Sequence, residues 1–250
     1  MVKRIFTGAA VGALISGQAF AFSFGSAGSG PLQTVLDDIT LGGSSSVNVL
    51  TDEVPDHLDS TWQIGGSGGA VSTLIIELAG FAPDNKFGIY DSEAPGTQVE
   101  VFDGVAAAGS QSVISILADG SVFVNFADTG IDFGANSFGF YLDTQVNQPG
   151  VGLWHSDTAL NSDGVDHMAA YQGVGDTIQI PPFAAGQWGE NEYILAFEDL
   201  HRNNPGFDGD YTDFVVLVES INPVPEAGTT VAFFGLALLG IGVVRRKLIT

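Results

Sequence analysis

The stretch YILAFEDLHRNNPGFDGDYTDFVVLVE, residues 193–219, decides the fold of this chain. Two runs rich in apolar and β-branched residues, 193–199 and 213–219, flank a connection rich in Asn, Gly and Asp. Runs of this length and composition are typical of strands, and the polar connection is typical of a turn region. We therefore predict an antiparallel hairpin in which the end of the first strand lies beside the start of the second.

The rest of the body repeats this pattern of short strands separated by turn residues. The strongest short hairpin signal is Asp119-Gly120, which stands between two runs rich in Val and Ile. No segment outside the two ends shows a sustained helical period. Further strands are expected at residues 72–79, 87–90, 98–102, 112–117, 121–126, 137–143 and 177–180. This pattern favours an all-β fold, specifically a β-sandwich, of which a jelly roll is one form.

The charge of the chain is strongly negative, with a formal net charge of −22 over 250 residues. Between positions 22 and 228 the only basic residues are Lys86 and Arg202. A body of this charge repels nucleic acid and anionic membrane surfaces and attracts cations. The chain contains no cysteine, which excludes disulfides and thiolate metal sites. Either bound divalent cations or a well-packed core alone must then stabilise the body.

The N-terminal end has the layout of a secretory signal peptide. Lys3 and Arg4 precede an apolar run, and Ala19 and Ala21 are the small residues before the expected cleavage site. We therefore expect residues 1–21 to be a signal peptide. Residues 22–46 contain Gly- and Ser-rich runs and are expected to be a flexible N-terminal segment, and residues 47–222 are expected to be the sandwich body.

The C-terminal end, residues 223–250, predicts a membrane-inserted sorting tail. An apolar stretch there is followed by a basic cluster that includes Arg245 and Arg246. A helix over about residues 227–244 would be about 27 Å long, which is enough to span a thin hydrocarbon core. Because basic residues beside a membrane segment stay in the cytoplasm, the body is expected to lie outside.

The residues at the start of this tail resemble those of a known type of sorting signal. Val224, Pro225 and Glu226, followed by small residues, an apolar helix and a basic end, resemble the PEP-CTERM tail, with Ala227 in place of the second proline. The resemblance implies processing by an exosortase-type enzyme in a Gram-negative bacterium that makes exopolysaccharide. It also implies export across the inner membrane, transient anchoring, and a final place at the cell surface or in the extracellular matrix.

The hairpin at residues 193–219 predicts a cation site. If its strands pair, Glu198, Asp199 and Asp213 converge with the loop carboxylates of Asp208 and Asp210. Like charges in one site disfavour ionisation, and a hard cation reverses this effect. Calcium accepts carboxylate, carbonyl and water oxygens, which suits a loop of Gly, Asn and Asp. The alternative is a solvated loop whose Asp and Asn residues serve turns.

The same region carries a second resemblance. FEDL at residues 197–200 and DGDYTD at residues 208–213 resemble a bacterial exported domain of unknown function that has FEDL and DxDYND signatures, with Thr212 in place of the usual Asn. An upstream run that contains Asp163 and Asp166 looks like the acidic loop that precedes these signatures, so the resemblance covers residues 154–219. It implies a β-rich module without established activity, for which calcium is the expected cofactor, and it adds Asp163 and Asp166 to the candidate ligands.

These observations predict a non-enzymatic, calcium-stabilised envelope or matrix protein associated with exopolysaccharide. One alternative is a carbohydrate-binding module, in which aromatic residues stack on sugars. The candidates are Trp62, Trp154 and Trp188, with Tyr171 and Tyr211. Another is a secreted glycosidase, which needs two carboxyl groups about 5–5.5 Å or about 6.5–9.5 Å apart. Glu198 and Asp199 are a poor pair for this role, because neighbours on a strand should point to opposite faces.

Overall fold

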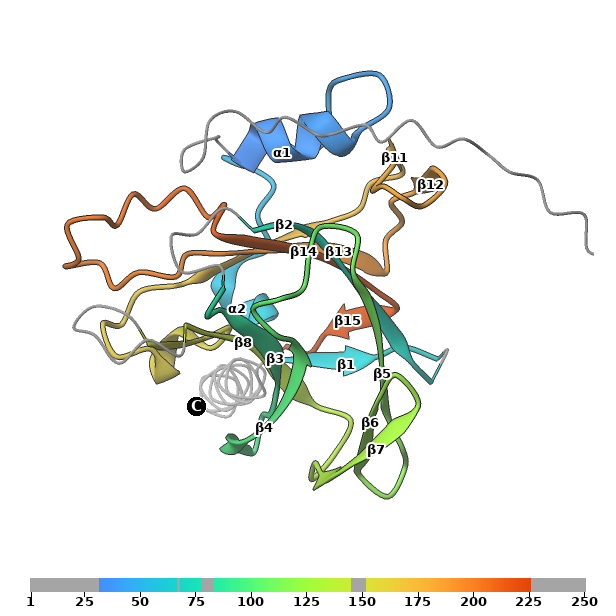
Figure 1. The fold of residues 1–250 in the computed structure, drawn as a ribbon, viewed down its shortest axis with the longest axis vertical. Coiled ribbons are helices and arrows are strands. Elements are labelled where there is room, and N and C mark those ends of the chain that lie inside the picture. The colour runs from blue at the N-terminus through green and yellow to red at the C-terminus, as the bar shows by residue number, and fades with distance from the viewer. Residues whose placement is uncertain (1–31, 67, 78–82, 145–151, 226–250) are drawn as a thin grey trace, which may run out of the picture.

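Two antiparallel β-sheets packed face to face form the body of the protein (Figure 1). The structure is a computed structural model that describes residues 32–66, 68–77, 83–144 and 152–225. The expected all-β sandwich is confirmed. The signal peptide, with Ala19 and Ala21, and the expected membrane helix over residues 227–244 lie outside the described residues. Within them, no helix combines the length and apolar character needed to cross a membrane.

The first sheet has the strand order β15-β1-β8-β3-β4, with β9 also paired to β8. Its strands are β1 (Trp62–Ile64), β3 (Lys86–Asp91), β4 (Ala94–Phe102), β8 (Phe138–Asp143), β9 (Leu153–His155) and β15 (Ile221–Pro223). The second sheet has the order β10-β13-β14-β2-β5-β6-β7. Its strands are β2 (Ala70–Glu77), β5 (Gln111–Ile116), β6 (Ser121–Val124), β7 (Ala127–Asp132), β10 (Met168–Gln172), β13 (Glu192–Phe197) and β14 (Phe214–Glu219).

Shorter elements complete the described chain. A small third sheet pairs β11 (Thr177–Ile178) with β12 (Gly186–Gln187). The helices are α1 (Leu32–Ile39), α2 (Asp56–Asp59) and the 3-10 turn η1 (Thr158–Leu160). Figure 1 shows α1 and the β11–β12 pair outside the seven-stranded sheet.

Both predicted hairpins are present. β13 pairs with β14 along its whole length, with Phe197 opposite Phe214 at the end beside the acidic loop. β5 pairs with β6 around the Asp119-Gly120 turn. Gly120 has φ of +97°, a left-handed conformation that glycine adopts without a steric penalty, which explains why this dipeptide predicted the turn.

Aromatic rings from both sheets fill the space between them. The ring of Phe87 on β3 stacks on that of Phe214 at 5.1 Å and meets that of Phe197 edge to face at 5.9 Å. Trp62 on β1 packs against Phe140 on β8, and all five side chains are fully buried. Burial of each such side chain contributes about 1.5–3 kcal/mol, so these contacts hold the two sheets together.

The helix α1 covers the outer face of the second sheet. Its buried residues Leu32, Val35, Leu36 and Ile39 follow the i, i+3, i+4, i+7 spacing of one helical face. They pack on the residues of β10, β13 and β14 that point away from the sandwich: Ala169, Tyr171, Ile194, Ala196, Val215 and Leu217. β13 and β14 are therefore buried on both faces.

The expectation of a flexible segment over residues 22–46 is wrong for residues 32–46. The helical period is present there but spans only eight residues, which is too short to stand out as a sustained pattern. Past the helix, Thr40 forms a bridge to Ile178, and the hydroxyl of Ser45 donates to a carboxylate oxygen of Asp176 at 2.9 Å. Side-chain packing and these hydrogen bonds hold the segment against the body.

Truncation of the α1 contact is expected to destabilise the whole body. Leu36→Ala removes a completely buried side chain, so we expect a loss of about 2–5 kcal/mol in the free energy of unfolding by denaturant titration. Thr34→Ala, on the exposed face of the same helix, is the matched control and should change stability by about 0.5 kcal/mol or less. Equal stability of the Leu36→Ala variant and the parent would show that α1 does not support the sheet.

Candidate metal centre

The end of the β13–β14 hairpin brings three carboxylates together. Glu198 and Asp199 follow the last residue of β13, and Asp213 precedes the first residue of β14. Each offers an oxygen that lies within 4.8 Å of those of the other two. The side chains of Glu198 and Asp199 are almost completely buried, and Asp213 is half-buried. The register of the hairpin therefore assembles the centre of the predicted site.

The expectation that Glu198 and Asp199 point to opposite faces is wrong. Side-chain alternation requires strand geometry, and both residues lie past the end of β13. Oε1 of Glu198 accepts a hydrogen bond from the N–H of Leu200 at 3.2 Å, and Oε2 accepts one from the N–H of Gly209 at 2.9 Å. The N–H of Asp199 donates to Oδ2 of Asp213 at 3.0 Å. These bonds hold the turn so that both side chains contribute to the cluster.

The cluster holds more negative charge than its surroundings compensate. Burial raises the pKa of Glu198, and the neighbouring Asp213 raises it further. Burial likewise raises the pKa of Asp199 and that of Asp213, and the charge of Asp199 adds to the effect on Asp213. The exposed Asp208 adds more negative charge to both Glu198 and Asp199. A bound cation would relieve this repulsion.

Asn85, which the sequence analysis did not single out, extends the cluster. It lies directly before β3 and is almost completely buried. Its Nδ2 donates to Oδ2 of Asp199 at 3.3 Å, whereas its Oδ1 has no hydrogen-bond partner. Amide and carboxylate oxygens are hard donors of the kind that calcium accepts. The donor set at this end of the hairpin therefore suits a calcium ion.

A buried histidine supports the cluster from the side. Nδ1 of His167 lies 2.9 Å from the carbonyl oxygen of Glu198, and Nε2 lies 3.1 Å from Oδ2 of Asp163. Both ring nitrogens face oxygen acceptors, so the ring forms both bonds when it carries two protons. Trp154 stacks on this ring at 3.8 Å, and its indole N–H donates to the carbonyl oxygen of Asp199 at 2.6 Å. Trp154 and His167 thus fix the backbone of both cluster residues.

The other predicted ligands lie around the cluster rather than in it. Asp208 is exposed, and Oδ1 of Asp210 accepts hydrogen bonds from the N–H and the hydroxyl of Thr212, as in a turn. Asp163 is engaged with His167: burial opposes its ionisation, but hydrogen bonds outweigh burial and lower its pKa. Asp166 belongs to a different group of carboxylates. The structure therefore does not bring Asp163 and Asp166 into this cluster.

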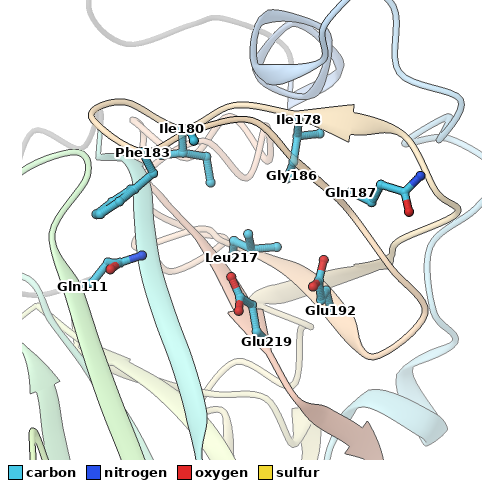
Figure 2. A pocket seen from close by; sticks show the side chains of 10 residues that line it. Gln111, Ile178, Ile180, Phe183, Gly186, Gln187, Glu192, Leu217 and Glu219 are labelled. Atoms are coloured by element: carbon cyan, nitrogen blue, oxygen red, sulfur yellow. The ribbon is translucent and has the colours of Figure 1, made fainter. Parts of the chain in front are cut away.

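The three tryptophans cannot serve as sugar platforms, because Trp62, Trp154 and Trp188 are almost completely buried. A pocket of about 150 Å³ lies on the outer face of the second sheet. Figure 2 shows Phe183 and Gln111 on one side of it and Glu192 and Gln187 on the other. The residues that line it are Gln111, Ile178, Ile180, Phe183, Ala184, Gly186, Gln187, Glu192, Leu217 and Glu219. An aromatic ring beside amides and carboxylates is a donor and acceptor set that fits a sugar.

The residues expected to direct sorting begin directly after β15. The N–H of Val224 donates to the carbonyl oxygen of Thr61 at 2.8 Å, so the chain stays attached to the sheet edge up to this point. Pro225 is the last described residue, and Glu226, Arg245 and Arg246 lie outside the described part of the chain.

The metal-free protein is expected to lose stability as the pH rises. The folded pKa values of Glu198, Asp199 and Asp213 are raised, so above about pH 5 the folded state retains protons that the unfolded state has released. The free energy of unfolding then falls with pH, by at most about 1.4 kcal/mol per pH unit for each retained proton. Thermal melting in chelator from about pH 5 to about pH 8 measures this slope.

Glu198→Gln should make this slope shallower, and the exposed Glu190→Gln is the matched control that should leave it unchanged. A melting temperature that rises over the same range, or an equal slope in both variants, would contradict the electrostatic picture.

Comparison with known proteins identifies the C-terminal tail. Residues 223–248 match the VPDSG-CTERM motif. The stretch Val224-Pro225-Glu226-Ala227-Gly228 follows this motif with Glu for Asp and Ala for Ser, so no second proline is expected, and the assignment to PEP-CTERM is corrected to this related tail. Searches of curated proteins and of solved structures gave no match. The chain therefore carries an exosortase-type sorting tail, which indicates an exported protein that is membrane-anchored before an exosortase-type enzyme processes it.

Proposed function

We propose that this protein is a non-enzymatic, calcium-stabilised β-sandwich that resides at the cell surface or in an exopolysaccharide matrix after its tail has been processed. The observation that carries the calcium proposal is the cluster of Glu198, Asp199 and Asp213, whose oxygens lie within 4.8 Å of one another in a largely buried site. The unpartnered Oδ1 of Asn85 supports the same assignment.

Calcium suits this cluster better than other common cations. Every side-chain donor present is an oxygen, which disfavours zinc, since zinc prefers nitrogen and sulfur ligands. The cluster is built on a turn between two strands, and calcium tolerates the irregular coordination that such a turn provides, whereas magnesium demands a near-ideal octahedron. A calcium ion would join the two ends of the 200–213 connection and cancel the repulsion between the strand ends.

Calcium is expected to raise the melting temperature of the full chain. At a concentration about 100 times the dissociation constant, a single site adds about 2.7 kcal/mol to the free energy of unfolding, which is about 5–10 °C for a body of this size. The measurement compares thermal melting in calcium, in magnesium and in chelator.

The double variant Glu198→Gln/Asp213→Asn should lose the part of this rise that the cluster provides. The exposed double variant Asp38→Asn/Glu190→Gln removes the same number of charges and should keep the full rise. Identical melting temperatures of the parent in calcium and in chelator would remove the calcium proposal.

A carbohydrate-binding role is the second candidate, and the pocket beside Phe183 favours it (Figure 2). Glu192 and Glu219 lie opposite each other in the β13–β14 register and both border the pocket. Burial raises the pKa of Glu219, and the charge of Glu192 raises it further. Carboxylates and amides at the edge of an aromatic ring can accept and donate hydrogen bonds to sugar hydroxyls.

If this pocket binds sugars, retention on polysaccharide columns or on a glycan array should fall about tenfold in Phe183→Ala, because the stacking surface is lost. Phe126→Ala removes an exposed ring that does not line the pocket and is the matched control, which should bind as the parent does. Absence of retention of the parent on every polysaccharide tested would count against this role.

A further inference from the structure

A second group of carboxylates lies outside the cluster at the hairpin end. Glu53, Asp56 and Asp166 each offer an oxygen within 4.8 Å of the others. Glu53 and Asp56 are exposed, and Asp166 is half-buried. The group shares no residue with the Glu198 cluster. Glu53 and Asp56 are not among the ligands that the sequence predicted.

Backbone pairing fixes the positions of these residues. The N–H of Val54 donates to the carbonyl oxygen of Ala170 at 2.9 Å, and Glu53 forms a bridge to Tyr171, so this segment lies along β10. Asp166 lies two residues before the start of β10, where its Oδ1 accepts a hydrogen bond from the N–H of Met168 at 3.0 Å. The backbone pairing therefore brings the segment that contains Glu53 close to Asp166.

A completely buried carboxylate, Asp59, lies beside Asp56 on α2. Its side chain has no exposed surface, and neither of its carboxylate oxygens has a hydrogen-bond partner. It lies three residues after Asp56 in α2, so both side chains share one face of the turn. Burial raises the pKa of Asp59 to about 9, and the largest contributions from other charges come from Asp166, then Asp56, then Glu53. Its carboxyl group thus interacts with all three members of the group.

The two basic residues of the described chain do not compensate this charge. The ammonium group of Lys86 lies 2.7 Å from Glu100 in an exposed ion pair on the first sheet. Arg202 is exposed and lies in the 200–213 connection, where its backbone N–H donates to Asp163. A buried carboxylate without hydrogen bonds is costly unless a cation or a proton neutralises it.

We propose that Glu53, Asp56 and Asp166 form a second cation site, which binds a hard divalent ion such as calcium independently of the Glu198 cluster. The ion would also balance the buried, unpartnered carboxylate of Asp59, and the exposed carboxylates of Glu53 and Asp56 close the site from the solvent side. Because these two residues are exposed, an ion can enter without opening the fold. A hollow of about 380 Å³, bordered by Glu53 and Tyr171, lies beside the site and leaves room for the water ligands of the ion.

The number of calcium ions bound per chain tests this proposal directly. The full chain, purified in mild detergent and freed of metal, is titrated with calcium by equilibrium dialysis. We expect two ions per chain in the parent. Glu53→Gln/Asp56→Asn should bind one ion fewer, because both changed residues belong to this site alone. Both residues are exposed, so the substitutions should leave the fold intact. Circular dichroism of the variant checks that the loss of an ion is not caused by misfolding.

Two further variants separate this site from the cluster at the hairpin end. Glu198→Gln/Asp213→Asn should also lose one ion, but a different one, so that combining the four changes abolishes binding. Asp38→Asn/Glu190→Gln, the charge-matched control, should retain both ions. Asp59→Asn should weaken the second site about tenfold, since it removes a buried negative charge that the ion would balance. An unchanged number of bound ions in Glu53→Gln/Asp56→Asn would overturn the second site, whatever the outcome at the Glu198 cluster.

Discussion

Phe197 lies opposite Phe214 in the pairing of β13 with β14, and the rest of the structure depends on this register. Alternate residues of the two strands enter the space between the sheets, and those between them meet α1 on the outer face. A shift by one residue would exchange the two sets, so that each would face side chains that pack on the other set in the native fold. The same register sets Glu198 and Asp199 beside Asp213, because the residues just beyond a paired end remain neighbours. Core packing and site assembly therefore follow from one pattern of backbone hydrogen bonds.

Buried carboxylates in the described part of the chain differ in how their charge is balanced. Asp163 faces His167 and the backbone N–H groups of Val165 and Arg202, and its pKa is lowered. Glu198 receives two backbone hydrogen bonds, which do not offset its burial beside Asp213, and its pKa is raised. The chain has too few basic residues to pair each buried acid with a basic side chain, as His167 is paired with Asp163. A retained proton, or the proposed calcium ion, balances the others, which links the extreme acidity of the sequence to its folded stability.

The sequence predicted the sandwich and the central hairpin because their strands are long and rich in β-branched residues. It missed β10, whose MAAYQ sequence lacks a β-branched residue, and β1, β9 and β15, which have three residues each and depend on neighbouring strands. Convergence of Glu198 with Asp213 followed from one local pairing and could be predicted. The approach of Asn85 to Asp199 could not, because it depends on a contact between segments far apart in the chain. The position of His167 between Asp163 and Glu198 depends on tertiary packing in the same way.

The location of α1 has a consequence for the order in which the chain can fold. α1 is the first described element, yet the surface that it covers is built from β10, β13 and β14, which come from the last part of the body. A chain that is synthesised or moved across a membrane N-terminus first therefore delivers α1 long before its docking surface exists. Closing so long a loop is slow, and until β14 arrives the docking surface of the helix lacks Val215 and Leu217. Completion of the fold is thereby tied to the arrival of the segment directly before the sorting tail, so that a body interrupted before β14 lacks the outer layer as well as its last strands.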